Sequence, residues 1–208
     1  MIWLAIALTM AAPATSQNIC VPERPTILAL PYVTFDQNMD AGWRAVAARA
    51  ECTVEAADLI KQYRERKDAE SRSLAWHEGQ LRAEAGQSLD AIALMRSTLR
   101  PALLWGRSQD DWNSYVRATI AFLRRDRAGL LDARRRLAAY PDPPANYVWI
   151  DEEGRQQRGK PVGWPYNLDV VDGLINCFDQ PQCEAYSVAC RQSRLPKSAI
   201  HHPSVEKK

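Results

Sequence analysis

The sequence predicts an all-α protein in which about four antiparallel helix pairs stack side by side. One observation is that apolar and small residues recur at helical spacing between short polar breaks. The second is an internal repeat, since Ala45 and Ala57 are matched by Gly79 and Ala91 thirty-four residues later. A period of this length is typical of stacked helical hairpins, and small residues allow two helix axes to approach closely.

The first sixteen residues have the composition of an export signal. They carry no charged side chain, and the small residues Ala12, Ala14 and Ser16 lie where a signal peptidase would cut. The apolar run is shorter than the roughly 20 residues that a membrane-spanning helix needs. We therefore expect a signal peptide over 1–16, no transmembrane segment after its removal, and a periplasmic or secreted protein. The alternative is an amphipathic first helix of the domain.

Five cysteines are expected to form one or two disulfides, because an exported chain leaves the reducing cytoplasm. The odd count leaves one thiol unpaired and fifteen two-bridge arrangements open, five choices of the free thiol times three pairings. Cys183 and Cys190 are not expected to pair, because seven residues along one helix rise about 10 Å, more than a disulfide spans. Cys177 and Cys183 flank a short turn and are the first candidate pair; Cys20 with Cys52 is the second.

The prolines and apolar residues of 17–39 predict an extended arm packed on the helices. The helical domain is expected over 40–195, starting with Asp40 as an N-cap. Glu51 to Thr53 interrupts the helical pattern, so residues 40–66 form the first helix pair.

The second pair is expected from about Ala69, with a turn at Ala85-Gly86 and a helix start at Ser88. Its stretch from Trp76 to Met95 resembles a tetratricopeptide repeat (TPR), although Arg82 stands where that family more often has an aromatic residue. The resemblance implies a TPR-like helical stack.

The whole chain also resembles uncharacterised exported proteins of Gram-negative bacteria. The motifs that carry this likeness are Trp76-His-Glu-Gly-Gln80, Trp112-Asn113 with Tyr115, Ala121-Phe-Leu123 and Asn167-Leu-Asp-Val-Val-Asp172. This likeness implies an envelope location and no particular activity.

A third pair is expected to begin at the capping-box variant Ser108 to Asp111, and a fourth to run from Asn167 to Cys190. Between them lies a long insert, 140–166, rich in proline and glycine; loops of this length are often functional. Residues 147–158 of the insert could form a small β-hairpin. The tail 196–208 is expected to be flexible.

The charge balance argues against a nucleic-acid partner, because 27 basic and 25 acidic residues leave a net charge of only +2. The sequence has no phosphate-binding glycine loop, nucleophile elbow or dinucleotide fingerprint, so we expect no cofactor. No second histidine follows His77 at helical spacing, so we expect no metal site there.

Three kinds of residue are candidates for binding. Trp149 and Trp164 of the insert, with Trp105 in another loop, are the tryptophans best placed for contact with a ligand, whereas Trp43, Trp76 and Trp112 fall on predicted inner faces. His77 is the only histidine of the helical body and is either a helix-surface or interface histidine that makes one hydrogen bond, or a ligand or general base in a groove. The third kind is a set of arginines expected on one helix flank, either a solvated face or a patch for acidic protein, anionic lipid or wall polymer: Arg117, Arg124 and Arg127.

Together these observations predict an exported TPR-like interaction or scaffold domain that binds a protein or peptide in the bacterial envelope and has no catalytic residue. Two alternatives stay open at this level. One is an exported hydrolase that uses His77 with a carboxylate from another helix. The other is a structural envelope component that adheres through its arginine patch.

Overall fold

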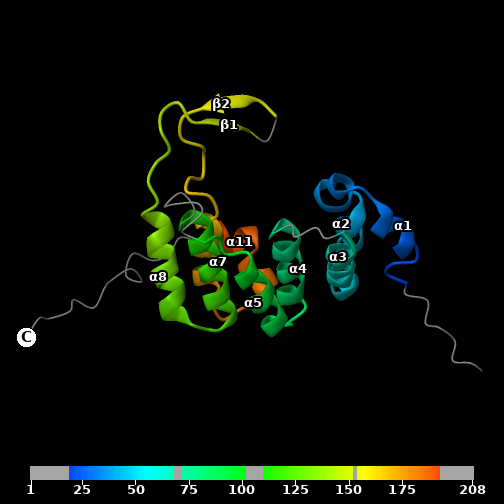
Figure 1. The fold of residues 1–208 in the computed structure, drawn as a ribbon. Coiled ribbons are helices and arrows are strands. Elements are labelled where there is room, and N and C mark those ends of the chain that lie inside the picture. The colour runs from blue at the N-terminus through cyan, green and yellow to red at the C-terminus, as the bar shows by residue number, and fades with distance from the viewer. Residues whose placement is uncertain (1–18, 68–71, 102–109, 152–153, 193–208) are drawn as a thin grey trace, which may run out of the picture.

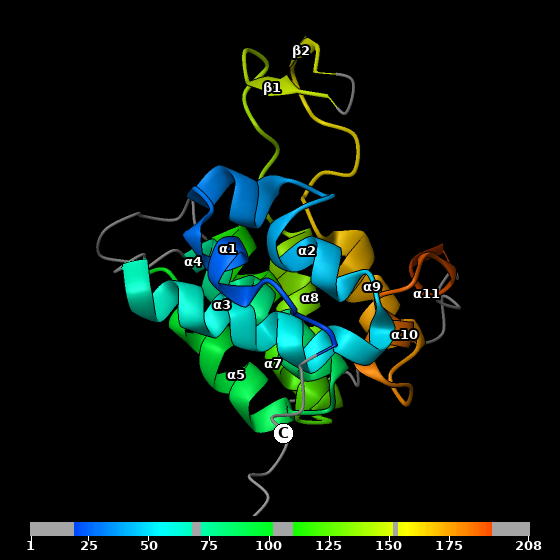
Figure 2. The same cartoon turned by 90° about the vertical axis from the view of Figure 1, so that its right-hand side faces the viewer.

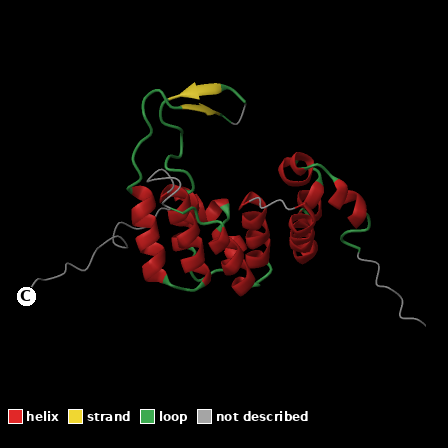
Figure 3. Cartoon of the chain, in the orientation of Figure 1, coloured by secondary structure: helices red, strands yellow, loops and turns green. Residues whose placement is uncertain are grey.

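The computed structural model describes residues 19–67, 72–101, 110–151 and 154–192, which form a mostly helical molecule. The all-α class is therefore confirmed. The helices lie in a row from α8 at one end to α1 at the other, and a two-stranded ribbon projects from one side (Figures 1 and 3). The expected signal peptide, Trp105, the helix start at Ser108 and the tail lie outside the described residues.

The N-terminal segment is helical, so the extended arm expected over 17–39 is wrong. It contains α1 (Arg24–Ala29) and a π-helical turn, η1 (Val33–Gln37). Pro25 lies in the first turn of α1, where proline fits because no backbone N–H is needed there. The segment is held by a disulfide between Cys20 and Cys52, one of the two pairings that the sequence suggested.

The next elements are α2 (Gly42–Ala47), the 3-10 turn η2 (Ala50–Cys52) and α3 (Thr53–Lys67). Figure 2 shows α1 and α2 lying against α3. The helix begins at Gly42, so its N-cap is Ala41 and not Asp40. Gly42 has a φ of +58°, and a Cβ there would overlap the backbone of Phe35, so both the conformation and the space favour glycine.

The central hairpins have the expected form. Helix α4 (Arg72–Glu84) is followed by α5 (Ser88–Ser97), and α7 (Asp110–Leu123) is followed by α8 (Arg127–Ala138). A Cβ on Gly79 of α4 would lie 3.1 Å from Met95 Cγ and 3.4 Å from the Ala91 carbonyl oxygen of α5. The small residue therefore permits close contact between the two helices, as the sequence pattern indicated.

The C-terminal part consists of α9 (Leu168–Asn176), α10 (Gln182–Ala185) and α11 (Val188–Gln192). Cys177 is bonded to Cys190, and Cys183 is a free, exposed thiol, so the expected bridge from Cys177 to Cys183 is wrong. The reason is that residues 182–192 form two short helices and not one. The second helix returns to the end of α9 and brings Cys190 beside Cys177.

Two apolar clusters form the interior, and α4 contributes to both. Trp76 and Ala83 of α4 belong to the cluster shared with α5, α7, α8 and α9. Leu74 and Leu81 of the same helix belong to the cluster shared with α1, η1, α2 and α3. The N-terminal segment and the hairpins are thus joined through α4. No helix among the described residues is long and apolar enough to cross a membrane.

The insert contains the β-hairpin that the sequence allowed, formed by β1 (Val148–Ile150) and β2 (Gln156–Arg158) in antiparallel register. This ribbon stands away from the helices (Figure 1).

Candidate functional site

The larger groove of interest runs along α3, α4 and α5, and we call it the α3–α5 groove. Its volume is about 700 Å³. Helix α4 forms the floor, while α3 and α5 form the two walls. The residues that line it are Asp58, Lys61, Arg64, Glu65, Glu78, Arg82, Gln87, Asp90, Ala93 and Leu94.

A network of charges is fixed at the floor of this groove. The Glu78 carboxylate is buried, with 4% of its side chain exposed, and receives Arg64 from α3 as an ion-pair partner. Arg82, one turn along α4, lies 3.7 Å from the same carboxylate and donates to Asp58 Oδ1 of α3 at 2.6 Å. It also donates to Gln87 Oε1 at 2.9 Å. These contacts hold α3 against α4 and fix the shape of the floor.

Burial raises the pKa of Glu78 above its ordinary value, and this effect outweighs the opposite effect of Arg64 and Arg82. The carboxylate is thus held in the interior at a cost that Arg64 and Arg82, together with the charge of Lys61, partly offset.

Other charged side chains of the groove remain available to a ligand. Within the described residues, Lys61, Glu65 and Asp90 form no ion pair, and all three are exposed. They carry charges of both signs and border the apolar side chains of Ala93 and Leu94. The groove therefore offers fixed polar groups at its floor, free charges at its rim and a small apolar wall.

Sequence reasoning missed most of this site. The sequence assigned no role to the charged residues of α3, and only the packing of α3 on α4 brings Arg64 and Asp58 to Glu78 and Arg82. One signal was present: Arg82 departs from the repeat pattern, and it is the residue that links α3, α4 and the start of α5.

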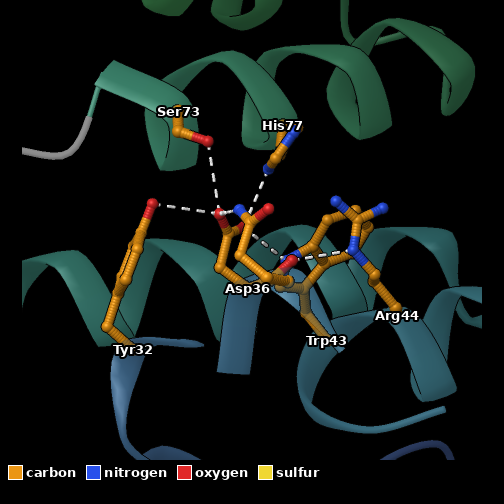
Figure 4. Close-up of polar contacts among 7 residues, drawn as sticks. Tyr32, Asp36, Trp43, Arg44, Ser73 and His77 are labelled. Atoms are coloured by element: carbon orange, nitrogen blue, oxygen red, sulfur yellow. Dashed lines mark hydrogen bonds and ion pairs between the residues drawn. The ribbon is translucent and has the colours of Figure 1, made fainter. Parts of the chain in front are cut away.

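Of the alternatives that the sequence left open for His77, the structure has an interface histidine: it lies between α4 and η1, in a buried cluster around Asp36 (Figure 4). His77 is 18% exposed, and its Nδ1 lies 2.8 Å from Asp36 Oδ1. The indole Nε1 of Trp43 donates to the same oxygen at 2.9 Å. Ser73 and Tyr32 donate to Asp36 Oδ2, each at 3.2 Å, and Gln37 donates to it as well.

The Asp36 carboxylate is completely buried, and burial alone would raise its pKa. The hydrogen bonds from His77 and Trp43, together with the charge of His77, outweigh burial and lower the pKa well below its ordinary value. Asp36 is thus held ionised between η1, α2 and α4. The arrangement fastens the N-terminal segment to α4.

The hydrolase alternative needed His77 beside a carboxylate from another element, and Asp36 is such a carboxylate. However, the Ser73 hydroxyl of the cluster donates to the Asp36 carboxylate, which is not the arrangement of a nucleophile that donates to an imidazole base. His77 is also not among the residues that line the α3–α5 groove. The geometry is therefore that of a buried anchoring contact.

The two tryptophans of the insert do not converge on the α3–α5 groove. Trp164 lies in an aromatic cluster with Tyr140, Tyr147 and Tyr166, with ring centroids 5.2–6.0 Å apart, and donates to the Pro141 carbonyl at 3.2 Å. This cluster fixes the base of the insert. Trp149 lies on β1, and its indole Nε1 is buried without a hydrogen-bond partner in the described structure.

The three arginines also separate. Arg117 and Arg124 line a smaller cavity between α5, α7 and α8, whereas Arg127 lies over the ring of Phe178 at 5.3 Å and is not part of that cavity. Within the described residues, no group of histidine, cysteine or carboxylate side chains is arranged to hold a metal ion.

Comparisons of the chain with protein families, with curated proteins and with solved structures found no match. A proposal about function therefore depends on the geometry of the grooves and on the disulfides.

Proposed function

We propose that this protein is an exported binding module that holds a polypeptide segment of a partner protein in the α3–α5 groove and does not catalyse a reaction. The proposal is supported by the groove itself. Its floor holds the ion pairs around Glu78, and the exposed side chains of Lys61, Glu65 and Asp90 place charges of both signs at its rim. Two disulfides are compatible with an oxidising compartment, and we propose the bacterial periplasm or the exterior.

A polypeptide fits this groove better than a polyanion does. Glu65 and Asp90 would repel a nucleic acid or an anionic polymer, whereas a peptide can present charges of both signs to Lys61 and to the carboxylates. The apolar side chains of Ala93 and Leu94 add a contact for one or two apolar side chains of the partner.

The proposal includes a TPR-like arrangement of the helices. In it, α4–α5 and α7–α8 are successive hairpins, and α2–α3 is a shortened one, because α2 has six residues where α4 has thirteen. The support is that the groove and the smaller cavity have the same construction. Each has the first helix of a hairpin as its floor and the second helices of two successive hairpins as its walls.

The test is photo-crosslinking in an envelope extract, with a photoreactive residue at Ala93 in the groove and, separately, at Glu84, which lies on α4 outside it. We expect a discrete protein to be crosslinked from position 93 and not from position 84. Higher salt should weaken this capture, because exposed charges contribute to it.

The matched variants are Lys61→Glu/Glu65→Lys and Arg66→Glu/Glu84→Lys, both of which keep the net charge. The first pair swaps the free charges of the groove at a spacing that an α-helix tolerates, so α3 should keep its stability. The second pair lies on exposed helix positions outside the groove. Loss of the crosslink in the first variant alone supports the proposal; equal crosslinking in both, or equal labelling from position 84, rejects it.

A further inference from the structure

The smaller cavity, between α5, α7 and α8, has a volume of about 320 Å³, and we call it the arginine cavity. Helix α7 forms its floor, and the end of α5 and one side of α8 form its walls. Four arginines line it together with two aspartates and an apolar group of residues. The arginines are Arg96, Arg117, Arg124 and Arg136.

Three of these guanidinium groups are not neutralised by a partner in the described structure. Arg136 donates to Asp132 Oδ2 at 2.8 Å, but Arg96, Arg117 and Arg124 form no ion pair there. The second carboxylate of the cavity, that of Asp126, is engaged at the start of α8, where its Oδ1 accepts the backbone N–H of Gly129 at 2.9 Å. The lining therefore carries four positive side chains against the two negative ones of Asp126 and Asp132.

The rest of the lining is apolar. Ile120 and Ala121 of α7 and Ala133 of α8 are buried, and Leu99, beyond the end of α5, is partly buried against the same core. A ligand that fills the cavity would thus meet guanidinium groups on one part of its surface and aliphatic side chains on another. Ligand pockets commonly combine an apolar lining with a few placed polar groups, and they start at about this volume.

We propose that the arginine cavity binds a small soluble organic anion, a phosphate or carboxylate group carried on a short aliphatic body. Guanidinium groups bind both oxyanions through paired N–H donors, which ammonium groups cannot match. An extended polyanion or a charged membrane surface fits less well, because Asp126 and Asp132 stand beside the arginines. The proposal is independent of the α3–α5 groove and of its partner.

Four probes separate the contributions: hexyl phosphate, hexanoate, hexanol and inorganic phosphate, with binding measured by titration calorimetry of the full exported chain at low salt. We expect hexyl phosphate and hexanoate to bind, and hexyl phosphate to bind at least roughly tenfold more tightly than inorganic phosphate or hexanol, since each of these lacks one half of the contacts. Binding should weaken as salt is added.

The variant Arg117→Gln/Arg124→Gln should lose roughly tenfold or more of this affinity, the loss expected when a charge-assisted contact is removed. Its control is Arg66→Gln/Arg72→Gln, in which the same two substitutions fall on α3 and α4, outside the cavity and away from the residues that line it. The four arginines that the variant and its control replace are all exposed. Both proteins should therefore keep the helical circular dichroism and the thermal midpoint of the parent.

Three results would overturn the proposal. One is the absence of hexyl phosphate and hexanoate binding to the parent chain; another is an equal loss of affinity in the two variants. The third is retention on phosphatidylglycerol vesicles without binding of the soluble probes, which would assign the arginines to a membrane surface instead.

Discussion

Gly42 begins α2 with a φ of +58°, and an added Cβ would lie 2.1 Å from the carbonyl oxygen of Phe35. The positive φ and the short distance both occur where η1 meets the start of α2. The same turn of the chain carries Asp36 into its buried position. Gly86 also has a positive φ, +77°, but a Cβ there would meet no atom within 4 Å. A substitution at Gly86 therefore tests the cost of the left-handed backbone alone, and one at Gly42 tests that cost together with a steric clash.

Replacing Gly86 with Ala should lower the free energy of unfolding by about 1–2 kcal/mol, the cost of the left-handed backbone alone. Replacing Gly42 with Ala should lower it by at least about 3 kcal/mol, because the clash with Phe35 adds to that strain. Urea unfolding with the disulfides intact measures both. Equal losses in the two variants would mean that η1 does not pack on α2 as described.

Asp36 gives the molecule a defined dependence on acid. Its folded-state pKa lies below the value of about 3.9 that an unfolded aspartate has, so the folded state holds fewer protons than the unfolded state in acid. Its contribution to the free energy of unfolding is complete above about pH 5 and is lost as the pH falls below 4 toward the folded-state pKa. The cause is that protonation removes the negative charge that strengthens the contacts with His77 and Trp43.

The variant Asp36→Asn should therefore be less stable than the parent by about 3 kcal/mol at pH 7, since it breaks a buried, fully bonded charge. The difference between the two proteins should shrink as the pH is lowered below 4, where the parent also loses the charge. Urea unfolding of both at pH 7, 5, 4 and 3 tests this. A difference that stays constant over this range would show that the charge of Asp36 does not fasten η1 to α4.

At the scale of elements, the sequence predicted helices well where their signals are local. The turn at Ala85-Gly86 and the small Gly79 lie within the hairpin they define, so α4 and α5 were placed within a few residues.

The segment 17–39 was mispredicted because proline suits both an extended chain and a first helical turn. The burial of this segment against α3 decides between the two conformations. The α3–α5 groove could not be predicted, because Arg64 finds Glu78 only after α3 packs on α4.

The C-terminal elements provide a covalent test at this scale. Peptide mapping without reduction should recover Cys20 with Cys52 and Cys177 with Cys190, and iodoacetamide should label Cys183 in the native protein. Cys177→Ser/Cys190→Ser should lower the free energy of unfolding by about 3 kcal/mol, because the bridge closes a loop of 13 residues.

Cys183→Ser is the control for that pair and should change the free energy of unfolding by less than about 0.5 kcal/mol, since its thiol is exposed and unbonded. A Cys177 to Cys183 peptide in the map, or native labelling of Cys190, would contradict the path of α10 and α11.

At the scale of the whole molecule, α4 is the helix on which both apolar clusters meet. It gives Leu74 and Leu81 to the N-terminal cluster, Trp76 and Ala83 to the cluster of the hairpins, and Glu78 to the α3–α5 groove between them. A binding site built on this helix depends on both parts of the interior. The molecule should therefore unfold as one cooperative unit, since neither cluster can lose α4 without exposing the other.

Leu74→Ala tests that cooperativity. Leu74 is fully buried on α4, so its truncation should lower the free energy of unfolding by about 2–5 kcal/mol. Amide exchange should accelerate in α3 and also in α7 and α8, although Leu74 does not belong to the apolar cluster of those two helices.

The matched control is Leu28→Ala in α1, also buried in the N-terminal cluster but remote from α4 in the chain. Its effect should concentrate in residues 24–47, through local opening of the segment that covers α3. If exchange in Leu74→Ala also stayed confined to α1–α3, the N-terminal helices and the hairpins would be separate folding units, and the α3–α5 groove would lie between two parts free to move apart.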